Sequence, residues 1–280
     1  MSDALPASDR ASNIRAMHSA PATSCAHQGV RIAFIHITKV GGTMLDKSLQ
    51  LGCGHKCVWS SNHDLKESLA EARKATPLVI LRDPIDRLHS QFFYWRDGAE
   101  TGGFKRSDFD KAANRRLYPT LNSFVDGLRQ GSALANIIVT KKIGFTWDQH
   151  FAPQAYWMNG VHNQSYVVCY SKHKLVARTS ALLRRLKIPC NLSAAAHQFT
   201  IPQNRLTGAV NPTIPYQHEN LTEANLRWYR QSRFVRQGQD FQLWAPCADG
   251  HTAWYKLSPG HEARNGSLLD PSADSEADLE

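Results

Sequence analysis

The chain has 280 residues, of which 42% are hydrophobic and 9% aromatic, and it carries a formal net charge of +9. This composition is sufficient for a hydrophobic core and excludes a wholly disordered chain. No stretch approaches the roughly 18 apolar residues of a transmembrane helix, so we expect no integral membrane span. The basic balance favours anionic ligands, with a solvated basic surface as the alternative.

The first 28 residues are rich in Ala and Ser and show no apolar stripe, so we expect a disordered N-terminal segment at residues 1–28. No positively charged stretch leads into an apolar one, so no secretory signal peptide is predicted. A cytoplasmic location is therefore the first expectation, with the lumen of the secretory pathway or an organelle as the alternative. Four N-x-S/T sequons, at Asn163, Asn191, Asn220 and Asn265, would permit the secretory route.

A phosphate-binding turn is predicted directly after the first strand. Residues 32–37 form an apolar run typical of a buried strand, and a glycine turn and a helix follow. Gly41 and Gly42 let the backbone approach a ligand closely, while Lys39 adds a full positive charge. Thr43 can cap the helix and donate its hydroxyl to a phosphate oxygen. Backbone N–H groups at such a helix N-terminus favour an anion.

The order of residues in this turn does not fit a Walker A loop, in which the lysine follows the last glycine. It resembles the 5′-phosphosulfate loop of sulfotransferases that use 3′-phosphoadenosine 5′-phosphosulfate (PAPS), especially the carbohydrate enzymes of the heparan sulfate 2-O and 6-O type. Thr38 stands where that pattern has Pro, and Val40 where it has Thr. The resemblance implies PAPS contacts by Lys39, Val40, Gly41, Gly42, Thr43 and Met44.

Two cysteines lie close together after the predicted helix, at Cys53 and Cys57 with His55 between them. The spacing allows a metal knuckle, but no second Cys/His pair of standard spacing is evident, so we expect no metal. A local disulfide between the two cysteines is the other interpretation if the compartment is oxidising.

A histidine between the two phosphate motifs is the candidate general base. His63 directly precedes a capping box, Asp64 to Glu67, that predicts a helix through Ala72. A helix N-terminus disfavours imidazolium and keeps the ring basic near neutral pH. The resemblance implies that His63 takes the acceptor proton. The alternatives are a solvated loop histidine, His55 or His36 as rivals, and Glu67 as a substitute base; we expect His36 to orient the loop instead.

The second phosphate motif follows a short apolar run at residues 77–81, which predicts a central parallel strand. Asp83 is a candidate N-cap and Pro84 occupies the favoured first helical position. The pattern Leu-Arg-Asp-Pro-x-x-Arg, followed by a helical Ser, resembles the 3′-phosphate site of sulfotransferases. The resemblance implies that Arg82 and Ser90 bind the 3′-phosphate; the alternative is an ion pair of Arg82 with Asp83 or Asp86.

The second half of the chain supplies the remaining frame. We predict a strand at residues 166–170, a helix at 174–186 and one long helix from Thr222 to Trp244. Arg205 lies in a segment that resembles the sulfotransferase loop closing over the nucleotide, which implies a phosphate contact. Residues 97–157 interleave basic and aromatic side chains, including Phe109, Tyr118 and Trp157, and fit either an acceptor cleft or helices with a core side.

These patterns predict an α/β fold with a P-loop-like central parallel sheet flanked by helices, the sulfotransferase fold, over residues 29–257. A disordered acidic tail is expected at residues 258–280. The resemblance implies in-line transfer of the sulfuryl group of PAPS to a hydroxyl acceptor, expected to be an oligo- or polysaccharide, without a metal and without a nucleic-acid partner. The alternatives are a non-catalytic binding module for sulfated glycans or nucleic acid, and a small-molecule P-loop kinase.

Overall fold

The computed structural model describes residues 32–53, 57–60, 75–97, 107–139, 150–158, 165–192, 220–235 and 238–257. Within these residues five strands form one sheet in the order β2-β1-β3-β4-β5. The strands are β1 (Ile32–Ile35), β2 (Val58–Ser60), β3 (Thr76–Leu81), β4 (Tyr166–Cys169) and β5 (Trp254–Lys256). The first four strands are parallel, whereas β5 runs antiparallel to β4. The described residues therefore have an α/β fold with a mixed sheet.

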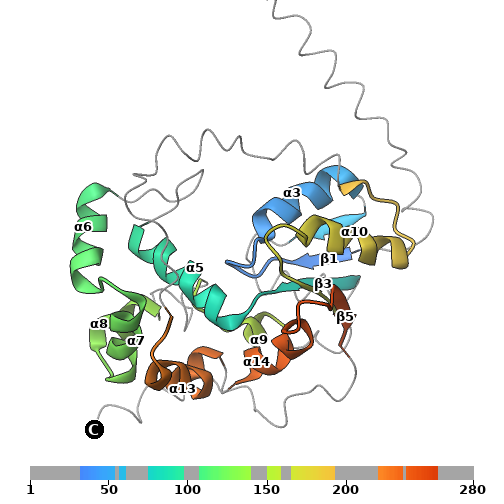
Figure 1. The fold of residues 1–280 in the computed structure, drawn as a ribbon. Coiled ribbons are helices and arrows are strands. Elements are labelled where there is room, and N and C mark those ends of the chain that lie inside the picture. The colour runs from blue at the N-terminus through green and yellow to red at the C-terminus, as the bar shows by residue number, and fades with distance from the viewer. Residues whose placement is uncertain are drawn as a thin grey trace, which may run out of the picture.

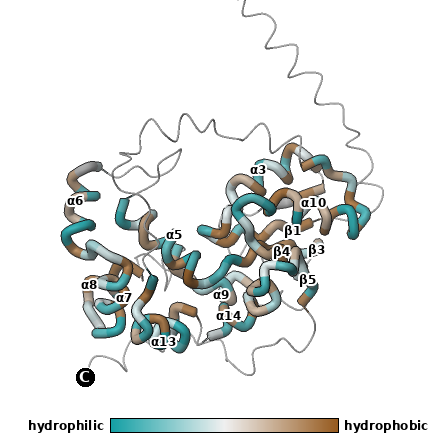
Figure 2. The backbone as a smooth tube through the Cα atoms, in the orientation of Figure 1, coloured by the Kyte–Doolittle hydropathy of each residue, from teal (hydrophilic) through white to brown (hydrophobic). Residues whose placement is uncertain are grey.

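The predicted strands after the N-terminal segment and before Arg82 are confirmed as β1 and β3. All four residues of β1 and the last five of β3 are buried. Strands covered on both faces carry continuous apolar runs, which is the pattern that the sequence showed. Figure 2 shows that the residues of these strands, at the centre of the sheet, are mostly hydrophobic. The antiparallel edge strand β5 was not predicted, so the sheet is mixed and not wholly parallel.

Helices cover both faces of the sheet. Figure 1 shows α3 (Gly42–Cys53) and α10 (Leu175–Arg185) on one side, and α9 (Gln154–Trp157) and α14 (Gln239–Trp244) on the other. Leu45 and Leu49 of α3, and Leu182 and Leu183 of α10, are at most 1% exposed and pack into the core around the sheet.

A second core lies among the helices away from the sheet. The helix α5 (Pro84–Asp97) starts beside the sheet and extends toward α6 (Asp108–Leu117), α7 (Leu121–Arg129), α8 (Ala133–Val139) and α13 (Glu223–Gln231) (Figure 1). Leu88 and Phe92 of α5 belong to this second cluster, with Phe124 and Tyr229 from other helices. The helix α5 therefore joins the sheet to the helical part of the molecule.

Two aromatic residues expected in an acceptor cleft belong to the core instead. Tyr118 is 7% exposed and Trp157 is 1% exposed, so neither ring is available to stack on a sugar. For these two residues the interpretation as the core side of packed helices is correct. Phe109 differs, because its side chain is exposed on α6.

The prediction of one long helix from Thr222 to Trp244 is wrong. The hydroxyl of Thr222 caps α13 by accepting from the Asn225 N–H at 3.3 Å, as expected of a helix start. The helix ends at Gln231 because Ser232 has extended backbone, and a short 3-10 turn, η3 (Arg233–Val235), follows. Gly238, with φ of +93°, then starts α14. A glycine in the left-handed region cannot belong to an α-helix, so Gly238 separates α14 from the segment before it.

Disulfides fasten elements that are distant in sequence. Cys53 at the end of α3 pairs with Cys190 beyond α10, and Cys169 at the end of β4 pairs with Cys247 in η4 (Ala245–Cys247). Cys57 is also disulfide-bonded. The sulfur of Cys53 is already bonded to that of Cys190, with the Cα atoms 4.4 Å apart. The predicted disulfide between Cys53 and Cys57 is therefore excluded. Neither Cys53 nor Cys57 offers a thiolate to a metal.

Candidate anion site at the carboxyl edge of the sheet

The two phosphate motifs lie at the same edge of the sheet. β1 and β3 are adjacent and parallel, so the residues that follow them leave the sheet side by side. The helix α3 begins at Gly42, and α5 begins at Pro84, so two helix N-termini start from this edge. Ligands of open α/β sheets bind outside the carboxyl ends of the strands, which makes this edge the candidate site.

The first loop has an unusual backbone at two of its residues. Lys39 has φ of +63° and Gly41 has φ of +81°, so both lie in the left-handed region. A non-glycine residue held there costs on the order of 1–3 kcal/mol, and residues of this kind cluster at functional sites. Successive N–H groups in such turns form concave anion-binding nests. Gly41, Thr43 and Met44 are exposed, so the start of α3 is open to a ligand.

Val40 differs from its neighbours in this loop. Its side chain is fully buried in the core around the sheet, so it can contact PAPS only through its backbone. The prediction of Val40 as a cofactor-binding residue is therefore limited to its amide group.

Each glycine of the loop fits closely against one aromatic ring. A Cβ atom added at Gly42 would overlap the ring of His36, and a Cβ atom at Gly41 would lie 2.7 Å from Cε2 of Tyr170. His36 is 5% exposed, so its ring packs beneath the loop and does not face solvent. His36 therefore lies where the expected role of orienting the loop requires it to lie.

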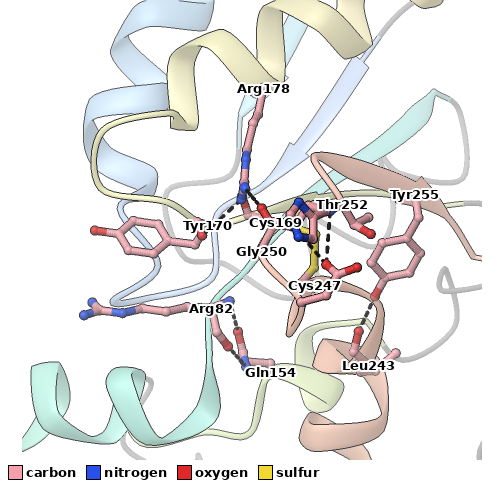
Figure 3. The surroundings of a disulfide bond; sticks show 12 residues. Arg82, Gln154, Cys169, Tyr170, Arg178, Leu243, Cys247, Gly250, Thr252 and Tyr255 are labelled. Atoms are coloured by element: carbon pink, nitrogen blue, oxygen red, sulfur yellow. Dashed lines mark hydrogen bonds between the residues drawn. A yellow bond between two sulfur atoms is a disulfide. The ribbon is translucent and has the colours of Figure 1, made fainter.

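Arg82 leaves the end of β3 toward the first loop. Its Nη1 donates to the carbonyl oxygen of Lys39 at 3.2 Å, and its guanidinium carbon lies 4.8 Å from the ring centroid of Tyr170. Figure 3 shows the Arg82 and Tyr170 side chains pointing the same way, with the ring above the guanidinium. The Nε atom of Arg82 is buried and has no hydrogen-bond partner in the described part of the chain. An anionic oxygen, such as that of a phosphate, is one acceptor that would satisfy this donor.

The alternative interpretation of Arg82 as an ion-pair partner does not fit. The Asp83 carboxylate accepts instead from the N–H groups of Ile85 and Asp86, at 2.8 and 3.0 Å, and so caps α5 as predicted. No ion pair joins Arg82 to Asp83 or Asp86, three residues that the structure describes.

Buried polar groups fix the backbone of Arg82. The Gln154 side chain accepts from the Arg82 N–H and donates to its carbonyl oxygen, both at 2.9 Å (Figure 3). Gln154 is itself held by Asp240, whose carboxylate accepts from the N–H groups of Gln154 and Ala155 at 2.8 Å. Gln154 and Asp240 are at most 1% exposed. The strand end that carries Arg82 is therefore rigidly placed.

A second arginine supports the loop from beneath. Arg87 is 2% exposed, and its Nε donates to the Thr38 carbonyl oxygen at 3.0 Å. Burial lowers the pKa of Arg87 to about 10, while the nearby Asp240 charge partly offsets that effect. The guanidinium is thus a buried cation directly behind the loop, and its field adds to the attraction of an anion.

Ser90 lies on the helix face that meets the loop. Arg87, Ser90 and Tyr94 are spaced three and four residues apart on α5, so they share one face. Arg87 contacts Thr38, and the Tyr94 ring centroid lies 3.0 Å from Nζ of Lys39. Since the residues on either side of it along this face both contact the loop, Ser90 faces the loop as well.

The structure thus brings together Lys39, the glycine turn and Arg82, and helical spacing along α5 places Ser90 on the face toward them. His63, its rival His55, its substitute Glu67, the predicted helix at 64–72 and Arg205 lie outside the described residues. The sequence interpretation missed four residues that build the site: Arg87, Tyr94, Gln154 and Tyr170. Helical spacing from Ser90 could have found the first two, whereas Gln154 and Tyr170 reach the site only through long-range packing.

No protein-family model, curated protein or solved structure matches this chain. Across the part of the chain that the structure describes, no helix has the length and apolar character required to cross a membrane. Among the same residues, no three His, Cys, Asp or Glu side chains gather as metal ligands would.

Proposed function

We propose that this chain is a PAPS-dependent sulfotransferase that transfers a sulfuryl group to a hydroxyl of a carbohydrate, on a P-loop-like sulfotransferase fold. One observation carries the proposal: the Arg82 guanidinium is bonded to the Lys39 carbonyl while its buried Nε lacks an acceptor. Two motifs that resemble the 5′- and 3′-phosphate sites of the family therefore meet at one corner of the sheet. A doubly phosphorylated adenosine supplies an anion for each of them.

The residues present fit such a donor. The loop amides and the Thr43 hydroxyl would hold the 5′-phosphosulfate at the start of α3, where the helix dipole favours negative charge. The Arg82 fork and the Ser90 hydroxyl would hold the 3′-phosphate, since a planar guanidinium donates two hydrogen bonds to one phosphate.

The proposed reaction is in-line sulfuryl transfer. A base, proposed to be His63, takes the proton of the acceptor hydroxyl as its oxygen forms a bond to sulfur. The bond between sulfur and the 5′-phosphate oxygen breaks, and adenosine 3′,5′-bisphosphate leaves. Negative charge grows on that bridging oxygen, so the Lys39 ammonium stabilises the transition state more than the ground state.

The order of the loop residues argues against a P-loop kinase. A kinase of that class needs a lysine and a magnesium-binding hydroxyl directly after the last glycine. Here the lysine precedes Gly41 by two residues, and its ammonium lies over the Tyr94 ring. The binding-module alternative keeps the same anion site and differs only in turnover.

The disulfides support a location in the secretory lumen over one in the cytoplasm. Disulfides persist in oxidising compartments and are rare in reducing ones. All the cysteines that the structure describes are in disulfides. The disulfides therefore favour the secretory lumen, which the sequence analysis gave as the alternative to the cytoplasm.

Replacement of Lys39 tests the proposed reaction. We expect Lys39→Ala to reduce transfer of labelled sulfate from PAPS to a carbohydrate acceptor panel at least a hundredfold, by analogy with the loss of an oxyanion-hole donor. Lys187→Ala is a matched control, because Lys187 also has a positive φ, of +57°, but lies beyond the far end of α10.

The control variant should transfer sulfate at the wild-type rate. Normal turnover by Lys39→Ala would refute the role of the lysine. Wild-type protein that binds adenosine 3′,5′-bisphosphate but transfers sulfate to no acceptor would favour the binding module.

A further inference from the structure

The ammonium group of Lys39 rests on an aromatic ring from the second motif. Its Nζ atom lies 3.0 Å from the ring centroid of Tyr94 on α5. The His150 ring stacks on the same tyrosine, with centroids 4.6 Å apart and planes inclined by 29°. An ammonium and an imidazole this close to one face would overlap, so they flank opposite faces of the Tyr94 ring.

Arg82, just before α5, and residues of α5 itself hold the backbone and the side chain of Lys39. Arg87 bonds to the carbonyl of Thr38, directly before the Lys39 backbone, and Arg82 bonds to the carbonyl of Lys39 itself. Two turns along the helix from Arg87, Tyr94 receives the far end of the lysine side chain. The backbone and the charged tip are therefore each held by a group of the second phosphate motif.

A lysine without such a contact is a poor catalyst. Its ammonium sits on a flexible four-carbon stem and adopts many rotamers in water. An aromatic face attracts a cation, because the ring quadrupole is negative above its centre. Charge stabilisation is most effective when the charged group is in place before the reaction starts.

We propose that Tyr94 is a positioning residue that holds the Lys39 ammonium beside the anion loop, acting through its ring and not through its hydroxyl. The expected effect on turnover rests on the proposed sulfotransferase function, whereas the contact between Lys39 and Tyr94 does not depend on that function. His150 supports the opposite face of the ring and so limits its rotation.

Two variants distinguish the effect of the aromatic ring from the effect of the volume that the side chain fills. Tyr94→Phe keeps the aromatic face, whereas Tyr94→Leu keeps a similar apolar volume without it. We expect Tyr94→Leu to lower kcat for PAPS-dependent transfer at least tenfold, with KM for PAPS changed by less than about threefold. The conservative Tyr94→Phe should restore kcat to within about twofold of wild type. Equal kcat values in the two variants would overturn the proposal.

A second readout does not depend on turnover. In a protein carrying ¹³C-labelled lysine, ring current should shift the Hε resonance of Lys39 upfield, with Lys39→Arg identifying the signal by its loss. The shift should persist in Tyr94→Phe and disappear in Tyr94→Leu. Persistence of the shift in Tyr94→Leu would overturn the positioning role. A ring-dependent shift in a wild-type protein without sulfate transfer would support the positioning of Lys39 and overturn only the proposed function.

Discussion

At the scale of single residues, the anion site depends on cations that are held before any ligand binds. Arg82 and Arg87 both donate to carbonyl oxygens of the first loop, and both come from the second motif. A buried arginine requires a compensating charge, which Asp240 supplies through the pair's Coulombic interaction. The motif Arg-Asp-Pro-x-x-Arg therefore places two cations against the first loop, of which Arg82 is the one proposed to bind the ligand.

Removal of Arg87 should destabilise the protein. Arg87→Leu would remove a buried cation close to the Asp240 carboxylate, together with the hydrogen bond that Nε donates to the Thr38 carbonyl oxygen, so we expect the free energy of unfolding to fall by up to about 3–5 kcal/mol. Chemical denaturation measures this loss as a lower midpoint. The exposed Arg129, which pairs with Asp126 at 2.9 Å, provides the control, since exposed pairs contribute about 0–1 kcal/mol. An unchanged midpoint in Arg87→Leu would show that the buried pair does not stabilise the fold.

At the scale of elements, the strand–loop–helix unit leaves no room for side chains at its glycines. Gly42 faces the His36 ring and Gly41 faces Tyr170, so the loop is enclosed from two sides. The sequence analysis predicted that these glycines let the backbone approach a ligand, whereas the close neighbours that the structure shows are two protein rings. The contact with Tyr170 was not predictable, since Tyr170 follows β4 and lies more than a hundred residues away in the sequence.

Gly42→Ala should disrupt the loop. The added methyl group would overlap His36, so either the ring or the start of α3 must move. We expect at least tenfold weaker binding of adenosine 3′,5′-bisphosphate, measured by calorimetry. Gly131→Ala is the matched control: its φ of +71° strains an alanine, but no atom lies within 4 Å of the new Cβ. Equal binding by Gly42→Ala and wild type would mean that the loop does not contact the ligand.

The limits of prediction at this scale have physical causes. Both motif strands and the start of α5 were predictable, because apolar runs and capping residues are local signals. The end of α13 was missed, because no local signal marked Ser232, where the backbone becomes extended, as a helix end. Gln154 and Asp240 gave no local signal, since they act across 72 and 86 residues of sequence on Arg82 and Gln154.

At the scale of the whole molecule, two cores meet at α5. One surrounds the sheet, and the other lies among the helices that include α7 and α13. The candidate site is formed where α5 leaves the sheet, so its geometry depends on both cores. The disulfide from Cys169 to Cys247 joins the last residue of β4, directly before Tyr170, to η4 near the C-terminal end of the described residues.

Two tyrosines, Tyr229, which is buried, and Tyr255, which is partly buried, predict how the fold responds to alkaline pH. Burial raises the pKa of Tyr229 and of Tyr255 above the ordinary value of 10.0. The unfolded chain releases these protons near pH 10 and the folded chain does not, so stability falls as pH rises above that value. The lowered pKa of Arg87 has the opposite effect on stability, because the folded chain releases this proton at a lower pH than the unfolded chain does.

Absorbance at 295 nm checks this prediction, because it reports tyrosinate. Of the eight tyrosines, two should ionise only when the protein unfolds, and this delayed step should shrink in Tyr255→Phe. Ionisation of all the tyrosines before unfolding would contradict the assignment of Tyr229 and Tyr255 as buried phenols.

The central claim is that Lys39 and Arg82 belong to one site that holds both ends of a doubly phosphorylated adenosine. Calorimetry with adenosine 3′,5′-bisphosphate, adenosine 5′-monophosphate and ATP–magnesium tests it most directly. We predict that the bisphosphate binds at least tenfold more tightly than either other nucleotide, and that Arg82→Lys removes most of this preference, because a lysine lacks the planar fork. Equal affinity for the bisphosphate and the monophosphate, or a preference unchanged in Arg82→Lys, would contradict the account.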